Sequence, residues 1–89
     1  MSFGVFLYPK AARFLKKADP SLKRKIREDL VELADSPEQK GERLMHSPFW
    51  RLRVGDHRVI YEIDREHSRV IVLFIGHRKD VYDEFSRLL

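Results

Sequence analysis

A short turn between two strand-like runs is the feature that most constrains this chain. The dipeptide Gly55-Asp56 separates residues 50–54 from residues 57–63, and both runs are rich in β-branched and aromatic residues. Glycine at the first central position favours a two-residue hairpin turn. Because pairing counts outward symmetrically from such a turn, Arg53 faces Arg58. The stretch therefore predicts an antiparallel hairpin whose register is fixed.

The predicted register sorts the hairpin side chains onto two faces. One face is apolar, with His57 at its turn end, and it carries Trp50, Leu52, Val54, Val59, Tyr61 and Ile63. The other face carries Arg51, Arg53 and Arg58. Like charges directly across an antiparallel pair are destabilising unless an anion lies between them. This arginine face is compatible with an ordinary solvated sheet surface or with a polyanion site, and the hairpin alone does not choose between them.

Periodicity and breaker residues predict the remaining elements. In order they are a strand at 3–8, a helix at 9–18, a second helix capped by Asp19 and started by Pro20, a loop from 35 to about 48, the two hairpin strands, a strand at 69–75, and a turn at 76–80 leading to a last helix capped by Asp80. The order β-α-α-β-β-β-α places the chain in the α+β class. It predicts a small, mostly antiparallel sheet packed on a helical hairpin, with a C-terminal helix.

Length and charge limit the possible functions. The 89 residues predict one domain, 1–89. Lys and Arg number 18 against 14 Asp and Glu, a net charge of +4 that favours nucleic acid, an acidic protein or an anionic surface as the partner. The absence of cysteine excludes disulfides and thiolate metal sites. We find no signal peptide and no apolar run long enough for a membrane span, so we expect a cytoplasmic protein without membrane contact.

A second polar group follows the strand at 69–75. The sequence has no glycine-rich phosphate loop, no Ser/His/Asp set and no metal-ligand spacing, so we expect neither a metal nor a cofactor. The group consists of His77, Arg78, Lys79 and Tyr82. In a meander this end of the strand lies beside the start of the preceding strand. Arg58 and Arg78 are therefore expected to lie near each other.

Such a set of side chains suits a phosphodiester. Guanidinium groups bind phosphate oxygens bidentately and stabilise the charge of a five-coordinate transition state, and Tyr82 offers a ring for stacking or a hydroxyl for hydrogen bonding. RNA cleavage needs no metal when the substrate's own 2′-hydroxyl is the nucleophile. Arginine is too basic to accept the proton, which leaves His57, His77 and Tyr82 as candidates for the general base.

Two motifs, residues 50–61 and 75–82, closely resemble the RelE/ParE superfamily of bacterial and archaeal toxins, on its RelE side. The element order and length agree with it, so the resemblance covers essentially the whole chain. It implies an mRNA interferase, a ribosome-dependent endoribonuclease that cuts mRNA in the ribosomal A site. It also implies a co-expressed RelB-like antitoxin that wraps the toxin, with operator DNA bound only through the antitoxin complex.

The resemblance also assigns roles to individual residues. Arg58 and Arg78 match the arginines that bind and activate the scissile phosphate, and Tyr82 matches the tyrosine that orients the substrate. Arg51 and Arg53 fall where RelE-like toxins often have lysines, and only lysine can exchange a proton near neutrality, when its pKa is depressed. Those two arginines are therefore expected to bind RNA phosphate without proton transfer.

His77 and Lys79 are grouped with them as RNA-binding residues. Two other functions fit the same scaffold. One is a ParE-like inhibitor of DNA gyrase that performs no RNA chemistry. The other is a catalytically degenerate module that only binds antitoxin or operator.

Overall fold

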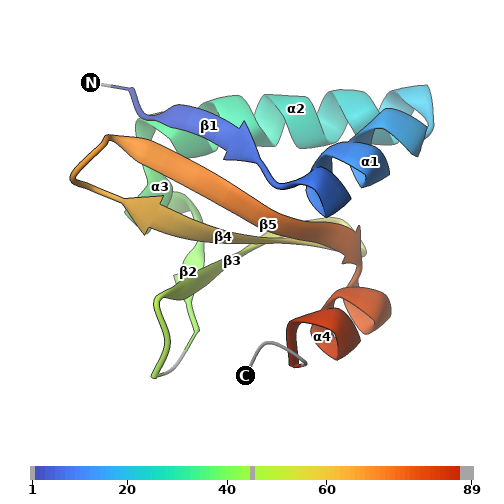
Figure 1. Ribbon diagram of the computed structural model, residues 1–89. Helices are drawn as coiled ribbons and strands as arrows, with labels where there is room; N and C mark the ends of the chain where they lie inside the picture. The colour runs from blue at the N-terminus through green and yellow to red at the C-terminus, as the bar shows by residue number, and fades with distance from the viewer. Residues whose placement is uncertain (1, 45, 87–89) are drawn as a thin grey trace.

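The computed structural model describes residues 2–44 and 46–86 (Figure 1). Their elements are β1 (Gly4–Leu7), α1 (Pro9–Lys17), α2 (Pro20–Asp35), α3 (Pro37–Lys40), β2 (Glu42–Arg43), β3 (Phe49–Val54), β4 (His57–Asp64), β5 (Arg69–His77) and α4 (Arg78–Ser86). In this part of the chain, one five-stranded sheet has the order β1-β5-β4-β3-β2. Strand β1 is parallel to β5, and the other neighbours are antiparallel. The predicted α+β class is confirmed.

Helices cover the two faces of the sheet unequally. The α1–α2 hairpin lies along one face, and the short helix α4 packs at one end of the other (Figure 1). We call these the inner face and the outer face. Among the described residues, no helix is long and apolar enough to cross a membrane.

Asp19 explains why α2 begins almost where α1 ends. Its carboxylate accepts hydrogen bonds from the backbone N–H groups of Leu22 at 3.0 Å and Ser21 at 3.1 Å, and Pro20 takes the first helical position. A helix start leaves such N–H groups unpaired, so a capping carboxylate stabilises it. The same bonds, that from Leu22 first, hold the pKa of Asp19 below its ordinary value. The predicted cap is confirmed.

The β3–β4 hairpin has the predicted register. Arg53 lies opposite Arg58, and Trp50 lies opposite Tyr61. At the turn, Gly55 has a φ of 59°, in the left-handed region that glycine adopts without a steric penalty. The alternation of side chains along the two strands then follows from the turn alone.

The main core lies between the inner face and the α1–α2 hairpin. Its fully buried side chains come from α1, α2 and three strands, and they include Ala11, Ile26, Leu33, Val54, Val59, Tyr61, Val70 and Val72. A smaller core lies on the outer face, where Val81 of α4 packs on Ile60 and Leu73. A bulge in β5 makes this possible, because Ile60 pairs with Phe74 and Tyr61 with Val72, so that Leu73 is the extra residue.

The structure differs from the sequence prediction in two segments. The predicted loop at 35–48 contains the short helix α3 and the strand β2, whose Glu42 pairs with Arg51. The predicted turn at 76–80 is absent, because β5 continues to His77 and α4 begins at Arg78. The Arg78 N–H donates to the Asp56 carbonyl at 2.9 Å, which extends strand pairing up to the helix. Asp80 is therefore in the first turn of α4 and is not its cap.

Candidate functional site

The three hairpin arginines lie on the outer face, as the register requires. Arg53 and Arg58 are direct cross-strand partners, and Arg51 lies on β3 opposite Glu42 of β2. Arg53 is exposed, whereas Arg51 and Arg58 are half-buried. Two half-buried guanidinium groups on one sheet face are costly without an anion, because burial removes charged groups from water.

Arg58 is folded back onto the hairpin turn. Its Nη1 donates to the carbonyl oxygens of Gly55 and His57, each at 2.8 Å. Its Nε is buried and has no hydrogen-bond partner among the described residues. A buried donor left unpaired costs about 1–3 kcal/mol. An unpaired cationic donor of this kind gains free energy when an acceptor such as a phosphate oxygen comes within hydrogen-bond distance of it.

Arg51 joins β3 to helix α4 through a hydrogen bond. Its Nη1 donates to the Tyr82 hydroxyl at 2.8 Å, and its Nη2 forms an ion pair with the Glu42 carboxylate. These contacts, that with Tyr82 first, raise the pKa of Arg51, and the Arg51 hydrogen bond lowers the pKa of Glu42. The Nε of Arg51 is buried and unpartnered within residues 2–44 and 46–86, as is that of Arg58. Both such donors therefore belong to the arginine face.

Arg78 and Lys79 open α4 directly after the end of β5. The Arg78 N–H bonds to the carbonyl of Asp56 in the hairpin turn, and Gly76, two residues earlier, lies opposite Arg58. The backbone thus places Arg78 close to Arg58 at the same end of the sheet. Both Arg78 and Lys79 are exposed.

His77 lies on the inner face, away from the arginines with which the sequence grouped it. It pairs across the sheet with His57, and the two rings meet edge to face with centroids 5.7 Å apart. The His57 ring also lies 5.8 Å from that of Phe14 in α1, and His77 Nδ1 accepts a 3.4 Å bond from the Lys79 N–H. Because β5 runs on to residue 77, alternation turns this side chain to the α1 side.

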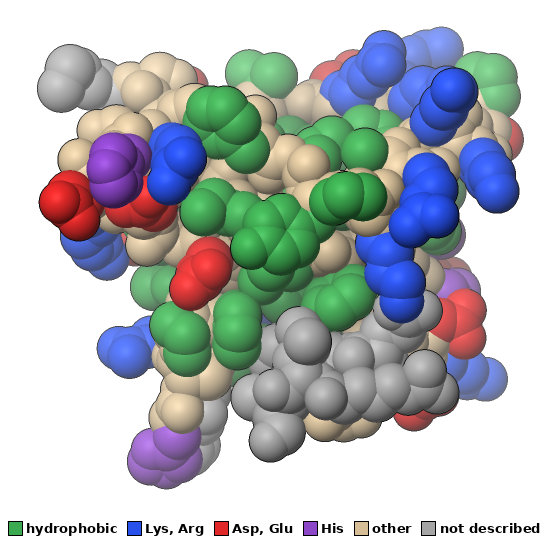
Figure 2. Space-filling view, viewed as in Figure 1, with side chains coloured by type: hydrophobic (Ala, Val, Ile, Leu, Met, Phe, Trp, Pro, Cys, Tyr) green, Lys and Arg blue, Asp and Glu red, His purple; other side chains and the backbone are tan. Residues whose placement is uncertain are grey.

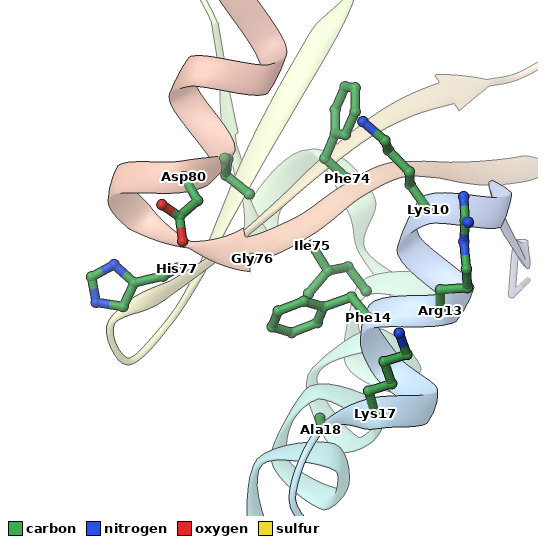
Figure 3. Close-up of a pocket in the computed structure, with 11 residues that line it drawn as sticks. Lys10, Arg13, Phe14, Lys17, Ala18, Phe74, Ile75, Gly76, His77 and Asp80 are labelled. Carbon is green, nitrogen blue, oxygen red and sulfur yellow. The ribbon is translucent and has the colours of Figure 1, made fainter.

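A groove of about 470 Å³ separates α1 from the end of β5 and the start of α4 (Figure 3). Its lining is apolar at Phe14, Ala18, Phe74, Ile75, Gly76 and Val81 and polar at Lys10, Arg13, Lys17, His77 and Asp80. The three cations come from one side of α1 at positions i, i+3 and i+7, a spacing that is visible in the sequence but that we did not single out there. Figure 2 shows Lys and Arg side chains gathered over this end of the α1–α2 hairpin, beside apolar side chains over β1 and β5.

The described residues contain no group of three or more His, Asp or Glu side chains arranged to hold a metal ion. The arginine face offers cationic donors, and Tyr82 adds one phenol beside them. Such groups bind and orient an anion, and they stabilise negative charge that develops on it.

The family model described as "ParE toxin of type II toxin-antitoxin system, parDE" matches residues 5–82. The chain belongs to the RelE/ParE superfamily of toxins. A shorter similarity links this toxin to Toxin RelG of Mycobacterium tuberculosis, with 47% identity over 30 residues. That alignment spans 34% of this chain and 34% of the relative.

Solved structures of RelE toxins share the fold of this toxin. The RelBE toxin–antitoxin complex from Mycobacterium tuberculosis matches with a TM-score of 0.77 and 28% identity, covering 88% of this chain and 100% of that chain. The isolated Escherichia coli RelE toxin matches with a TM-score of 0.77 and 20% identity, covering 99% and 100%. The archaeal RelE–RelB complex from Pyrococcus horikoshii matches with a TM-score of 0.75 and 22% identity, covering 88% and 97%. The last two likenesses concern the fold alone.

Proposed function

We propose that this toxin is a ribosome-dependent endoribonuclease that cuts mRNA in the A site without using a metal. The observation that carries the proposal is the group of Arg51, Arg58 and Tyr82, which we call the outer-face cluster. The buried, unpartnered Nε donors of the described residues belong to Arg51 and Arg58, and Arg51 holds the Tyr82 hydroxyl. Unpaired cationic donors beside a positioned phenol suit a phosphodiester.

In the proposed reaction the 2′-oxygen of the substrate attacks the adjacent phosphorus, and the bond from phosphorus to the 5′-oxygen breaks. The products are a 2′,3′-cyclic phosphate and a 5′-hydroxyl, which receives a proton as it leaves. Arg58 and Arg78 bind the phosphate and stabilise the added charge of the phosphorane, while Arg51, Arg53 and Lys79 bind neighbouring phosphates. Because charge stabilisation is realised in the transition state, these contacts raise kcat.

Tyr82 orients the 2′-hydroxyl in this proposal. Of the three general-base candidates, His57 and His77 pack edge to face on the inner face, which leaves Tyr82 on the side of the arginines. Of these three candidates the outer face therefore offers only Tyr82. We expect the ribosome to supply the missing proton transfer, so naked RNA should be cut far more slowly than mRNA on translating ribosomes.

Arg78→Ala tests the proposal directly. Removal of one transition-state donor typically costs about 3 kcal/mol, roughly a hundredfold or more in rate. Purified toxin added to translating ribosomes should give codon-phased cuts, and the variant should give almost none while keeping its thermal transition. Arg65→Ala, which removes an exposed arginine paired with Glu38, is the matched control. Cleavage by Arg78→Ala at the wild-type rate would reject the assigned role.

The match to the ParE family model favours a second candidate, inhibition of DNA gyrase by binding. A gyrase supercoiling assay run beside the translation assay separates the two functions. Inhibited supercoiling with intact mRNA supports the gyrase inhibitor, and the converse result supports the nuclease.

A RelB-type antitoxin is the proposed protein partner, since the similar Mycobacterium tuberculosis structure is a toxin–antitoxin complex. We propose that an acidic, amphipathic antitoxin segment occupies the groove beside α1. Its acids would face Lys10, Arg13 and Lys17, and its apolar side chains would cover the groove floor. Contact with operator DNA would then run through the antitoxin, and the complex would lie in the cytoplasm. Charge reversal at Lys10 and Arg13 should weaken antitoxin binding and leave mRNA cleavage intact.

A further inference from the structure

Glu42 belongs to a chain of contacts that ends at the candidate site. Its carboxylate binds Arg51, and the same guanidinium donates to the Tyr82 hydroxyl. We propose that Glu42 is a positioning residue, which fixes the Arg51 guanidinium so that this group holds Tyr82 in its working orientation. The consequence for catalysis rests on the proposed nuclease function, whereas the consequence for Tyr82 does not.

The backbone around Glu42 is held firmly in place. Glu42 is the direct cross-strand partner of Arg51, so the strand register brings their side chains together. Gly41, just before it, lies so close to the sheet that an added Cβ would collide with the Tyr61 hydroxyl and come within 2.8 Å of the Arg51 carbonyl oxygen. Tyr61 is fully buried, and its hydroxyl donates to the Pro37 carbonyl at 2.6 Å. The contact between Glu42 and Arg51 is thus built into the backbone of the α3–β2 segment.

The chemistry of arginine gives the chain of contacts a direction. A guanidinium only donates, so the Tyr82 oxygen accepts from Arg51, and the single O–H of the phenol has to donate to another group. With one terminal nitrogen on Glu42 and the other on Tyr82, the plane of the Arg51 guanidinium is defined at two points. Loss of Glu42 leaves one point, and the long arginine side chain regains rotamer freedom.

Other ion pairs of the described residues lack this connection. Arg65 with Glu38 and Arg69 with Asp64 bring together residues outside the outer-face cluster. Glu38→Ala therefore makes a matched control, because it removes an exposed acid four residues from Glu42 and breaks a comparable pair.

The orientation of Tyr82 is measurable in the free toxin. With ring-labelled tyrosine, an NMR spectrum reports on Tyr8, Tyr61 and Tyr82 separately. Glu42→Ala should shift the Tyr82 ring signals and leave those of Tyr8 unchanged, and Glu38→Ala should shift neither. Unchanged Tyr82 signals in Glu42→Ala would overturn the proposal, whether or not the toxin cuts RNA.

Kinetics on translating ribosomes give the second measurement. Glu42→Ala should lower kcat about fivefold, the size expected of an ion pair in which the acid is exposed. KM should stay equal or fall, because removing an acid from a phosphate-binding face does not weaken RNA binding. Glu42→Gln keeps an oxygen acceptor for Arg51 and should restore most of kcat. A raised KM with unchanged kcat, or a lower thermal stability alone, would show that Glu42 has no positioning role. Absence of cleavage by the wild-type toxin would count against the nuclease function and leave the NMR result to decide the role of Glu42.

Discussion

The inner and outer faces of the sheet come from the same strands but differ in their side chains and in how far helices cover them. On β4, Val59 points inward and is fully buried under the helical hairpin, whereas the neighbouring Arg58 points outward with an unpaired Nε. The inner core is continuous and apolar, and the outer core is a small cluster under α4. Phe6 on β1 remains 52% exposed on the outer side.

This difference separates stability from function. Apolar burial stabilises by roughly 25 cal/mol per Å², so the covered inner face supplies most of the folding free energy. The outer face retains half-buried cationic groups that an optimally stable protein would replace. We infer that the inner face maintains the fold and the outer face is kept available for a polyanion. Four predictions test that contrast, beginning with the largest effect.

Ile26→Ala should lower the free energy of unfolding by about 3 kcal/mol, because it opens a cavity in the inner core. Val81→Ala in the smaller core of the outer face should lower the free energy of unfolding by less, about 1–2 kcal/mol, since fewer side chains pack around Val81. Urea denaturation of both variants gives the two values. Equal costs would contradict the claim that the inner face dominates stability.

Tyr61→Phe should cost about 1–2 kcal/mol, because the Pro37 carbonyl loses its buried donor. Burial raises the pKa of Tyr61, so its hydroxyl is neutral in the folded protein. Tyr8→Phe, at an exposed tyrosine, is the control and should leave stability unchanged. Thermal unfolding of the three proteins compares them, and an unaltered transition in Tyr61→Phe would show that this bond contributes nothing.

Arg58→Met should change the free energy of unfolding by less than about 1 kcal/mol, because removal of the buried unpaired Nε donor offsets the loss of the two Nη1 hydrogen bonds to the Gly55 and His57 carbonyls. The same variant should lose mRNA cleavage by about a hundredfold. Urea midpoints and ribosome assays measure the two effects. A variant that is both less stable and fully active would reverse the assignment of the outer face.

Asp64→Asn should alter only the acid limb of the curve of stability against pH. Hydrogen bonds from Arg69 and then His67 hold the pKa of Asp64 at about 2, below its ordinary 3.8. A lowered folded-state pKa contributes stability above pH 3.8 that is lost as the pH falls towards 2. The urea midpoint of the variant should therefore fall less steeply over that pH range. Cleavage should be unchanged, because Asp64 lies at the other end of β4 from Arg58. An identical acid limb would contradict the assigned pKa.

The hairpin could be predicted from sequence because two features agree there. A glycine turn fixes the pairing, and period-two alternation then assigns Leu52 and Arg53 to opposite faces. Strand β2 could not be predicted, since two residues carry no periodicity and Glu42–Arg43 becomes a strand only by pairing with β3. The role proposed for Glu42 was hidden for the same reason.

The end of β5 shows a different limit of sequence reasoning. Gly76 resembled a breaker, and a turn was expected there, but the Arg78 bond to Asp56 carries the pairing on to the helix. Whether β5 ends at residue 75 or continues to residue 77 decides the face on which His77 lies. The positions of Arg51, Arg53 and Arg58 depended only on the hairpin turn, and their predicted register is confirmed.

The parallel pairing of β1 with β5 has a consequence for how the toxin is made. Gly4 lies opposite Arg69, so the first strand is synthesised long before the partner that completes its hydrogen bonds. Contacts so distant in the chain form slowly, and a nascent polypeptide still inside the exit tunnel has no β5 to offer. The sheet therefore closes only after β5 has been synthesised and has left the ribosome.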